Sequence, residues 1–272
     1  MVSTTGGSSR RRFLTVGAAW AAASVFREAL MSAGQPPAPA SNTPAQAVED
    51  LVTANRVLAH LGVLDGYGHV SARHPRVRDR FLLSRSIAPE LVAAGDVMEY
   101  NLDGGAVDPQ GRLSYLERFI HSEIYRARTD VNSIVHCHTP SVIPFANSTI
   151  VMRPMYHMSS FVAEGVPVFE IRDVAGLSNM LVTDGRLGQA LARTLGSRSA
   201  ALMRGHGAVV VGDAIPTAVA RAVYLDLNAR LQAQAIALGG TVTYLDPEEA
   251  RLWNSTNRYD RSWELWKKSM GR

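Results

Sequence analysis

Cysteine, charge and long apolar runs are all scarce in this chain of 272 residues. The single cysteine, Cys137, excludes an internal disulfide and is most simply interpreted as a small buried apolar residue. Charged residues make up 19% of the chain, and +3 of the net charge of +4 falls within residues 1–40. The remainder has no basic stripe, so nucleic-acid binding lacks electrostatic support. The 46% apolar content is that of a globular protein with a sizeable core.

The apolar run near the N-terminus is too short to span a membrane. Residues 16–26, VGAAWAAASVF, follow the cationic stretch SRRRFLT (9–15), and eleven residues cannot cross a hydrocarbon layer of about 30 Å as a helix. The arginines followed by Phe-Leu resemble a bacterial twin-arginine signal. We therefore predict a signal peptide and a Pro/Ala-rich linker over residues 1–40, export to the periplasm in the folded state, and no stable membrane insertion after cleavage. A disordered basic tail or a retained anchor is the alternative.

The rest of the chain alternates between helical and strand-like patterns. Apolar residues recur at helical spacing in 45–61, 114–129 and 215–239. Strand-like runs occupy 80–84, 133–140, 167–171 and 200–213, and the stretch 62–75 before the first of them is broken by glycines. This mixture predicts one α/β domain over residues 41–272.

Three histidines and one glutamate suggest a metal site. In the strand-like run SIVHCHTP (133–140), His136 and His138 share a face and Cys137 points the other way. His206 stands between two glycines that allow a tight turn, and Glu117 lies on the helix before the histidine strand. Three imidazoles and a carboxylate are the usual ligands of Zn²⁺ or another borderline divalent ion. Taken alone, the pair of histidines would equally fit core or surface positions.

The sequence resembles the class II aldolase/adducin family over nearly the whole chain after residue 45, and the same four residues carry this resemblance. That family's pattern has a glutamate on a helix, a His-x-His whose first histidine follows nineteen residues later, and a further histidine followed by glycine. Glu117, His136, His138 and His206 match it. The resemblance implies a three-layer α/β/α fold with a mainly antiparallel sheet and a homotetramer with active sites between subunits. It also implies one Zn²⁺ or Mn²⁺ per subunit held by the three histidines, with Glu117 as a fourth ligand or as the acid/base.

The chain departs from the sugar-phosphate members of this family in three loops. Those members carry Gly-Asn-x-Ser, a Thr-Gly loop and a Ser-Ser pair before the glutamate, small polar groups that cradle a phosphate. Here the loops read GHVS (68–71), SRS (84–86) and Tyr115-Leu116 before Glu117. We therefore expect the phosphate pocket to be lost.

The replacements favour a carboxylate substrate. A guanidinium fork binds planar carboxylates, so Arg85 is a candidate substrate-binding residue, together with Ser84, Ser86 and His157. These segments resemble the branch of the family that decarboxylates hydroxylated aromatic or pyridine dicarboxylates. A surface salt bridge for Arg85 and a core position for His157 remain the alternatives.

The sequence thus predicts a divalent-metal-dependent carbon–carbon lyase that decarboxylates a small hydroxylated aromatic acid through a metal-stabilised enolate. A proton must then reach carbon, and Glu117 is the first candidate to deliver it and His69 the second. His121, one helical turn after Glu117, either orients that carboxylate or lies at the helix surface. The alternative functions are an aldolase acting on a sugar or oxo-acid aldol, and a non-catalytic assembly domain like that of adducin.

Overall fold

A seven-stranded sheet forms the centre of the domain. The computed structural model describes residues 43–256 and 259–271, so the predicted leader lies outside the described residues. The strand order is β3-β2-β1-β4-β7-β6-β5, and every neighbouring pair is antiparallel except β5 and β6. The strands are β1 His69–Arg73, β2 Arg80–Ser84, β3 Val97–Asn101, β4 Ser133–Cys137, β5 Val168–Phe169, β6 Ala200–Met203 and β7 Gly207–Gly212. The mainly antiparallel sheet is as predicted.

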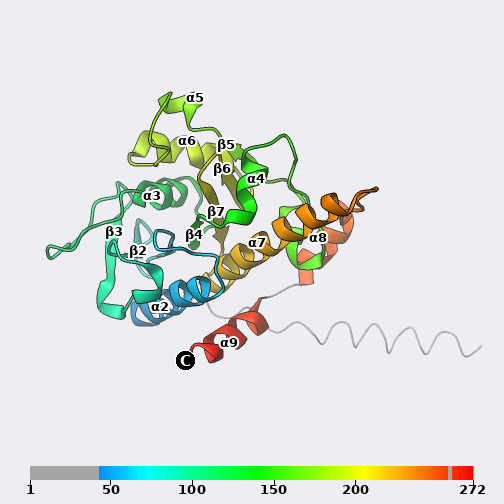
Figure 1. Cartoon of the computed structure of the whole chain (residues 1–272). Coiled ribbons are helices and arrows are strands. Elements are labelled where there is room, and N and C mark those ends of the chain that lie inside the picture. The colour runs from blue at the N-terminus through cyan, green and yellow to red at the C-terminus, as the bar shows by residue number, and fades with distance from the viewer. Residues whose placement is uncertain (1–42, 257–258, 272) are drawn as a thin grey trace, which may run out of the picture. The chain divides into compact units, whose positions relative to one another are not determined.

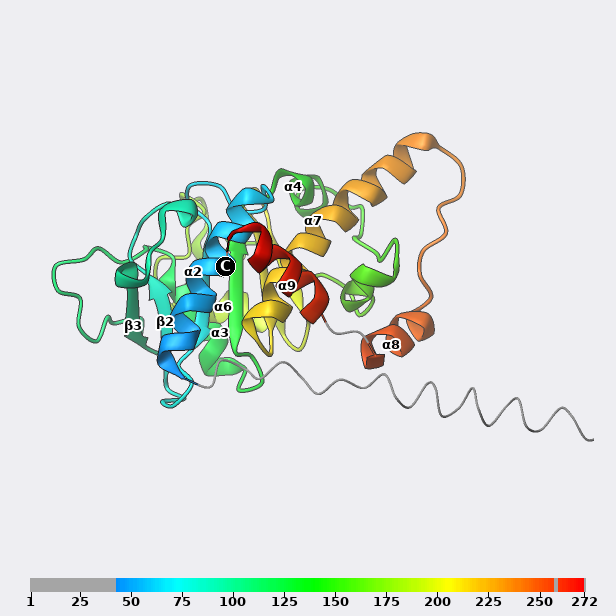
Figure 2. The same ribbon diagram turned by 90° about the horizontal axis from the view of Figure 1, so that it is seen from below.

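Helices cover both faces of this sheet, which gives the predicted three layers. The helices are α2 Pro44–His60, α3 Arg118–Ala127, α4 Ile143–Ala146, α5 Arg172–Ala175, α6 Gly185–Leu195, α7 Ile215–Leu238, α8 Pro247–Thr256 and α9 Asp260–Ser269. Short 3₁₀ turns occupy Pro89–Leu91, Ala94–Asp96, Pro140–Val142 and His157–Val162. Helices α2, α7 and α9 pack on one face, and α3 and α6 on the other (Figures 1 and 2). No helix within the described ranges is both long and apolar enough to span a bilayer.

The double cover explains why the central strands are apolar on both sides. On β4, Val135 and Cys137 join the core under α2 and α7, while Ile134 joins the core under α3 and α6. His136 alternates with Cys137 and therefore lies on the α3/α6 side. Cys137 is fully buried, and burial raises the pKa of its thiol to about 12, which keeps it an unreactive thiol, as expected from the sequence.

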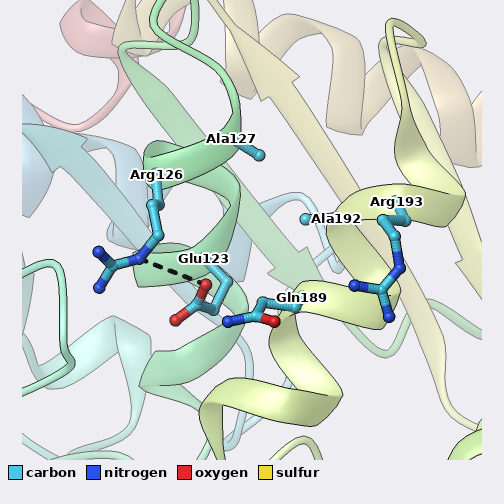
Figure 3. Close-up of a pocket in the computed structure, with 6 residues that line it drawn as sticks. All are labelled: Glu123, Arg126, Ala127, Gln189, Ala192 and Arg193. Atoms are coloured by element: carbon cyan, nitrogen blue, oxygen red, sulfur yellow. Dashed lines mark ion pairs between the residues drawn. The ribbon is translucent and has the colours of Figure 1, made fainter.

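The packing of α6 against α3 fixes the helix that follows Glu117. A Cβ atom on Gly188 would overlap the carbonyl oxygen of Phe119, so only glycine lets the two helices approach this closely. A cavity of about 190 Å³ opens beside this contact, and Figure 3 shows its six lining residues, all from α3 and α6. There the buried Glu123 carboxylate lies 3.4 Å from Nε of Arg126. This cavity is distinct from the histidine cluster.

Two sequence-based expectations about local structure are wrong. The helix predicted from residue 114 begins only at Arg118, because Nε of Arg118 donates to the carbonyl of Gly104 at 2.6 Å and the Tyr115 hydroxyl donates to the carbonyl of Ile87. These contacts hold the preceding residues in a loop. The segment GHVS (68–71), expected to be a loop, instead enters strand β1 at His69, which pairs with His136 of β4.

Candidate metal centre and active site

The four residues predicted to bind a metal converge on one point. Oε2 of Glu117 lies 3.4 Å from Nε2 of His136 and 3.4 Å from Nε2 of His206. Nε2 of His138 lies 3.1 Å from the same atom of each of the other two histidines. The ligand atoms of all four residues lie within 4.8 Å of one another. Segments 89 residues apart, from Glu117 to His206, thus meet at a single focus.

Each histidine of the cluster is held by its other nitrogen. Nδ1 of His136 lies 3.2 Å from the carbonyl oxygen of Ala208, and Nδ1 of His206 lies 3.1 Å from that of Met180. Nδ1 of His138 lies 3.1 Å from the carboxylate of Asp65. Because these oxygens only accept, each Nδ1 carries a proton and donates, which leaves each Nε2 directed at the common focus, where its lone pair can bind a cation.

Asp65 is a site residue that the sequence did not reveal. Burial tends to raise the pKa of its carboxyl group, but the backbone N–H groups of Tyr67 and Gly68 and the neighbouring His138 outweigh burial and lower it. The carboxylate is therefore ionised and can accept a hydrogen bond from Nδ1–H of His138. Its sequence context, LDGYG, is that of an ordinary turn, and only the fold brings it to a histidine 73 positions later.

The glycines around His206 are required by the geometry. Gly205 has a φ of +66°, a conformation that side chains disfavour. A Cβ on Gly207 would overlap the carbonyl oxygen of Cys137 and lie 3.1 Å from Cα of His138. Because Gly205 and Gly207 have no side chains, the turn between β6 and β7 can bring His206 into contact with the end of β4.

Glu117 stands at the N-terminal cap of α3 rather than on the helix, which corrects its expected position. Its Oε1 accepts a hydrogen bond of 2.9 Å from the backbone N–H of Val182, which leaves Oε2 directed at His136 and His206. Burial tends to raise the pKa of this carboxyl group, but the two histidines outweigh burial and hold it well below its usual range. Burial lowers the pKa of His136, whereas Glu117 outweighs burial at His206 and raises its pKa.

The donor set fits a divalent cation. Ligands in a tetrahedron at the Zn–N distance of about 2.0–2.1 Å lie about 3.3 Å apart, close to the separations of 3.1 Å and 3.4 Å in this cluster. Three lone pairs and a carboxylate facing each other repel unless a cation or protons lie between them. Histidine nitrogens with one carboxylate suit Zn²⁺ and similar transition-metal ions.

His69 lies beside the cluster and is buried, with 1% of its surface exposed. Its ring centre lies 5.1 Å from that of His136 and 4.4 Å from that of Tyr115. Its Nδ1 lies 2.7 Å from Nε2 of His121. Both roles predicted for His121, orienting Glu117 and lying at the helix surface, are wrong. His121 is fully buried, and its nitrogens contact His69 and Ser71.

The residues predicted to bind substrate lie in two places. Nε of Arg85 donates to Asp96 at 2.6 Å, so the ion pair considered for this residue is present, with the Arg85 side chain 38% exposed. Oγ of Ser84 lies 3.5 Å from the Tyr115 hydroxyl, and the backbone N–H of Ser86 donates to Leu113. Tyr115 in turn contacts His69, which connects this loop to the site.

His157 lies apart from these groups. It is exposed at the start of the 3₁₀ turn His157–Val162, and its ring centre lies 4.4 Å from that of Trp253 in α8. The alternative of a core histidine is therefore wrong. The structure places its ring contacts with Tyr156 and Trp253 rather than with the histidine cluster.

Comparison with known proteins identifies the family. The family described as "Class II Aldolase and Adducin N-terminal domain" matches residues 49–233. This chain therefore belongs to the class II aldolase and adducin family, as its motifs suggested.

Relatives within the family include decarboxylases. The decarboxylase tropJ of Talaromyces stipitatus is 34% identical over 244 residues, which cover 80% of this chain and 92% of that protein. A 3,4-dihydroxyphthalate decarboxylase of Arthrobacter keyseri is 30% identical over 226 residues, covering 77% of this chain and 87% of that protein. Among solved structures, the L-fuculose 1-phosphate aldolase of Glaciozyma antarctica PI12 superimposes with a TM-score of 0.71 at 22% identity, over 88% of this chain and 96% of that one. That likeness establishes the shared fold.

Proposed function

We propose that this protein is a divalent-metal-dependent lyase that removes CO₂ from a small hydroxylated aromatic carboxylic acid. The observation that carries the proposal is the convergence of three oriented Nε2 atoms and one carboxylate oxygen within 4.8 Å. The decarboxylases among its relatives support the choice of reaction. A non-catalytic assembly domain has no need of such a cluster.

His136, His138 and His206 would hold the metal, and Zn²⁺ and Mn²⁺ both suit the donor set. Bound there, the cation supplies positive charge that stabilises the negative charge developing as the carbon–carbon bond breaks. The residues of the chain then have to bind the acid next to this charge and move one proton.

We assign the transfer of that proton to Glu117. Its carboxylate is ionised, and its Oε2 faces the focus while Val182 holds Oε1. In the proposed reaction, Oε2 takes the proton of the substrate hydroxyl and delivers it to the ring carbon that loses CO₂. The phenolate left behind is then protonated by solvent, so that the acid becomes the hydroxyarene and CO₂.

The loop Ser84–Ser86 would bind a second carboxylate of the substrate. Nε of Arg85 is engaged by Asp96, and the partly exposed remainder of its guanidinium group keeps donors for a carboxylate. Tyr115 and Leu116 precede Glu117 where sugar-phosphate members carry two serines, so a phosphate loses those hydroxyl donors. This substitution favours a carboxylate substrate over a phosphorylated sugar.

The test is a comparison of two substrate classes on one preparation. Full-length protein loaded with Zn²⁺ or Mn²⁺ is incubated with hydroxylated aromatic dicarboxylates such as 3,4-dihydroxyphthalate, and separately with L-fuculose 1-phosphate and unphosphorylated ketoses. We expect CO₂ from the aromatic acids alone. Aldehyde release from a ketose without CO₂ would identify an aldolase instead, and failure to retain stoichiometric metal would favour an assembly domain.

Two further properties belong to this proposal. We propose a homotetramer with active sites between subunits, on the basis of the family resemblance, and light scattering of the purified protein tests it.

We also propose twin-arginine export to the periplasm from the sequence SRRRFL (9–14). Replacing both Arg10 and Arg11 with lysine should leave the precursor in the cytoplasm, and normal export of that variant would contradict the assignment.

A further inference from the structure

A chain of four buried polar groups runs from the metal centre into the core. Nδ1 of His69 lies 2.7 Å from Nε2 of His121, whose Nδ1 lies 2.6 Å from Oγ of Ser71. That hydroxyl lies 2.8 Å from the hydroxyl of Tyr125. All four residues are exposed by 1% or less. A buried polar chain of this kind is stable only when each of its donors has an acceptor.

The protons of this chain can be arranged in two ways. In the first, Tyr125 donates to Ser71, Ser71 donates to Nδ1 of His121, and Nε2–H of His121 donates to Nδ1 of His69. His69 then carries its own proton on Nε2. In the second, every bond is reversed: His69 donates from Nδ1, and Ser71 finally donates to the oxygen of Tyr125.

The far end of the chain selects between them. Within the described part of the protein, Ser71 is the only hydrogen-bond partner of the Tyr125 hydroxyl. The second arrangement would leave the buried O–H of Tyr125 without an acceptor. If Tyr125 instead donated to Ser71 while His121 also did, the hydroxyl hydrogen of Ser71 would be left without one, and either loss costs the desolvation of a buried donor. The first arrangement also leaves one donor, Nε2–H of His69, without a hydrogen-bond partner among the residues that the structure describes, but this atom is not one of the fully enclosed polar atoms that lack a partner. That atom belongs to the ring beside His136 and is available to a ligand.

We propose that Tyr125, Ser71 and His121 are positioning residues that hold His69 in the tautomer with its proton on Nε2, so that His69 donates a hydrogen bond to an oxygen of the bound acid. The identity of that acid rests on the proposed function. In this tautomer Nε2 has no free lone pair, so His69 binds substrate and Glu117 remains the base. Proton transfer along the chain would end in a buried phenolate, which the raised pKa of Tyr125 disfavours because burial penalises its charged form.

The tautomer can be measured without turnover. Full-length protein labelled with ¹⁵N in its histidine rings is loaded with Zn²⁺, and two-bond ¹H–¹⁵N correlations assign the protonated nitrogen of each ring. The variant His69→Asn identifies the His69 signals. We expect Nε2–H on His69 in the wild-type protein, and a mixture of tautomers in Tyr125→Phe, which keeps the ring and removes the terminal donor. A wild-type His69 protonated on Nδ1 would overturn the proposal, whatever reaction the protein catalyses.

Kinetics on the preferred aromatic acid provide the second measurement. His121→Phe keeps a ring of similar size but removes both nitrogens, and we expect KM to rise roughly tenfold or more as His69 loses its orientation. His121→Gln can still donate to His69 and should recover part of that loss. Ser122→Ala, at the next buried position of α3, is the matched control. If His121→Phe folds, keeps its metal and has the KM of the control, the positioning role is wrong.

Discussion

Nδ1 of His138 lies 3.1 Å from both carboxylate oxygens of Asp65. This contact fixes the ring of the most exposed histidine of the cluster, whose side chain is 20% exposed while that of His136 is fully buried. Carboxylates that accept the second N–H of a ligating histidine set the tautomer and raise the basicity of the ligand. Asp65 therefore links the turn before β1 to the metal centre.

Replacing Asp65 should weaken metal binding without unfolding the protein. We expect Asp65→Ala to reduce the affinity for Zn²⁺ by about 10- to 100-fold, because His138 loses its acceptor. Chelator competition measures this change. Asp103→Ala removes an exposed carboxylate paired with Arg126 and is the control. Equal affinities of the two variants would mean that Asp65 does not support the ligand.

His138→Ala should remove both the metal and the activity, because two histidines and a carboxylate then hold the ion without the central ring of the cluster. Metal content per chain after gel filtration is the direct measurement. His60→Ala, at the exposed C-terminal end of α2, provides the control and should bind metal normally. Full metal content in His138→Ala would contradict the assignment of this ligand.

Glu117→Gln should keep the fold and lose most of the turnover. The amide oxygen of glutamine can still accept the N–H of Val182, so the local structure is preserved while the proton carrier is lost. General acid–base catalysis contributes about 10²- to 10⁴-fold, and we expect kcat to fall within that range. Wild-type kcat in a metal-loaded Glu117→Gln protein would transfer the proton-carrying role to another group.

Arg85→Ala should raise KM for a dicarboxylate much more than for a neutral analogue, because one charged contact with the second carboxylate is removed. Arg80 is a close match as control: its side chain is 40% exposed against 38% for Arg85, and it pairs with Glu99 as Arg85 pairs with Asp96. Arg80→Ala should leave both KM values unchanged. If Arg85→Ala affects the two ligands equally, the residue has a structural role only.

The metal-free protein should lose stability on acidification, in part through His121. Burial lowers the pKa of His121 to about 3, below the value of about 6.5 in an unfolded chain. Between these values the unfolded state binds the extra proton, so the free energy of unfolding falls as the pH drops below about 6.5, by up to about 1.4 kcal/mol per pH unit for this one group. Above a pH of about 6.5, His121 makes no pH-dependent contribution to the free energy of unfolding.

Urea unfolding of the wild type and of His121→Gln, at several pH values between about 7 and about 5, isolates this contribution. We expect the variant to depend less steeply on pH, because it lacks the group that must stay uncharged in the folded protein. His60→Gln should keep the wild-type slope, since this residue is exposed. The same slope in all three proteins would show that His121 does not remain neutral in the core.

Much of the secondary structure could be predicted from local patterns, and the candidate ligand set from those patterns together with the family resemblance. The helical spacing of apolar residues in 215–239 corresponds to α7, Ile215–Leu238. The alternation of side chains on a strand correctly separated His136 from Cys137. Both inferences depend on geometry within a single element, which the chain determines by itself.

The start of α3 and the neighbours of His69 were decided by the tertiary structure alone, because both depend on contacts between distant segments. The start of α3 lies at Arg118 because of hydrogen bonds to the carbonyls of Gly104 and Ile87, which no local spacing encodes. The register of β1 against β4 set His69 beside His136, and the packing of α3 brought His121 to His69. The four candidate metal ligands could thus be named from the sequence. Their orienting partners became visible only once the folded strands and helices set the distances between them.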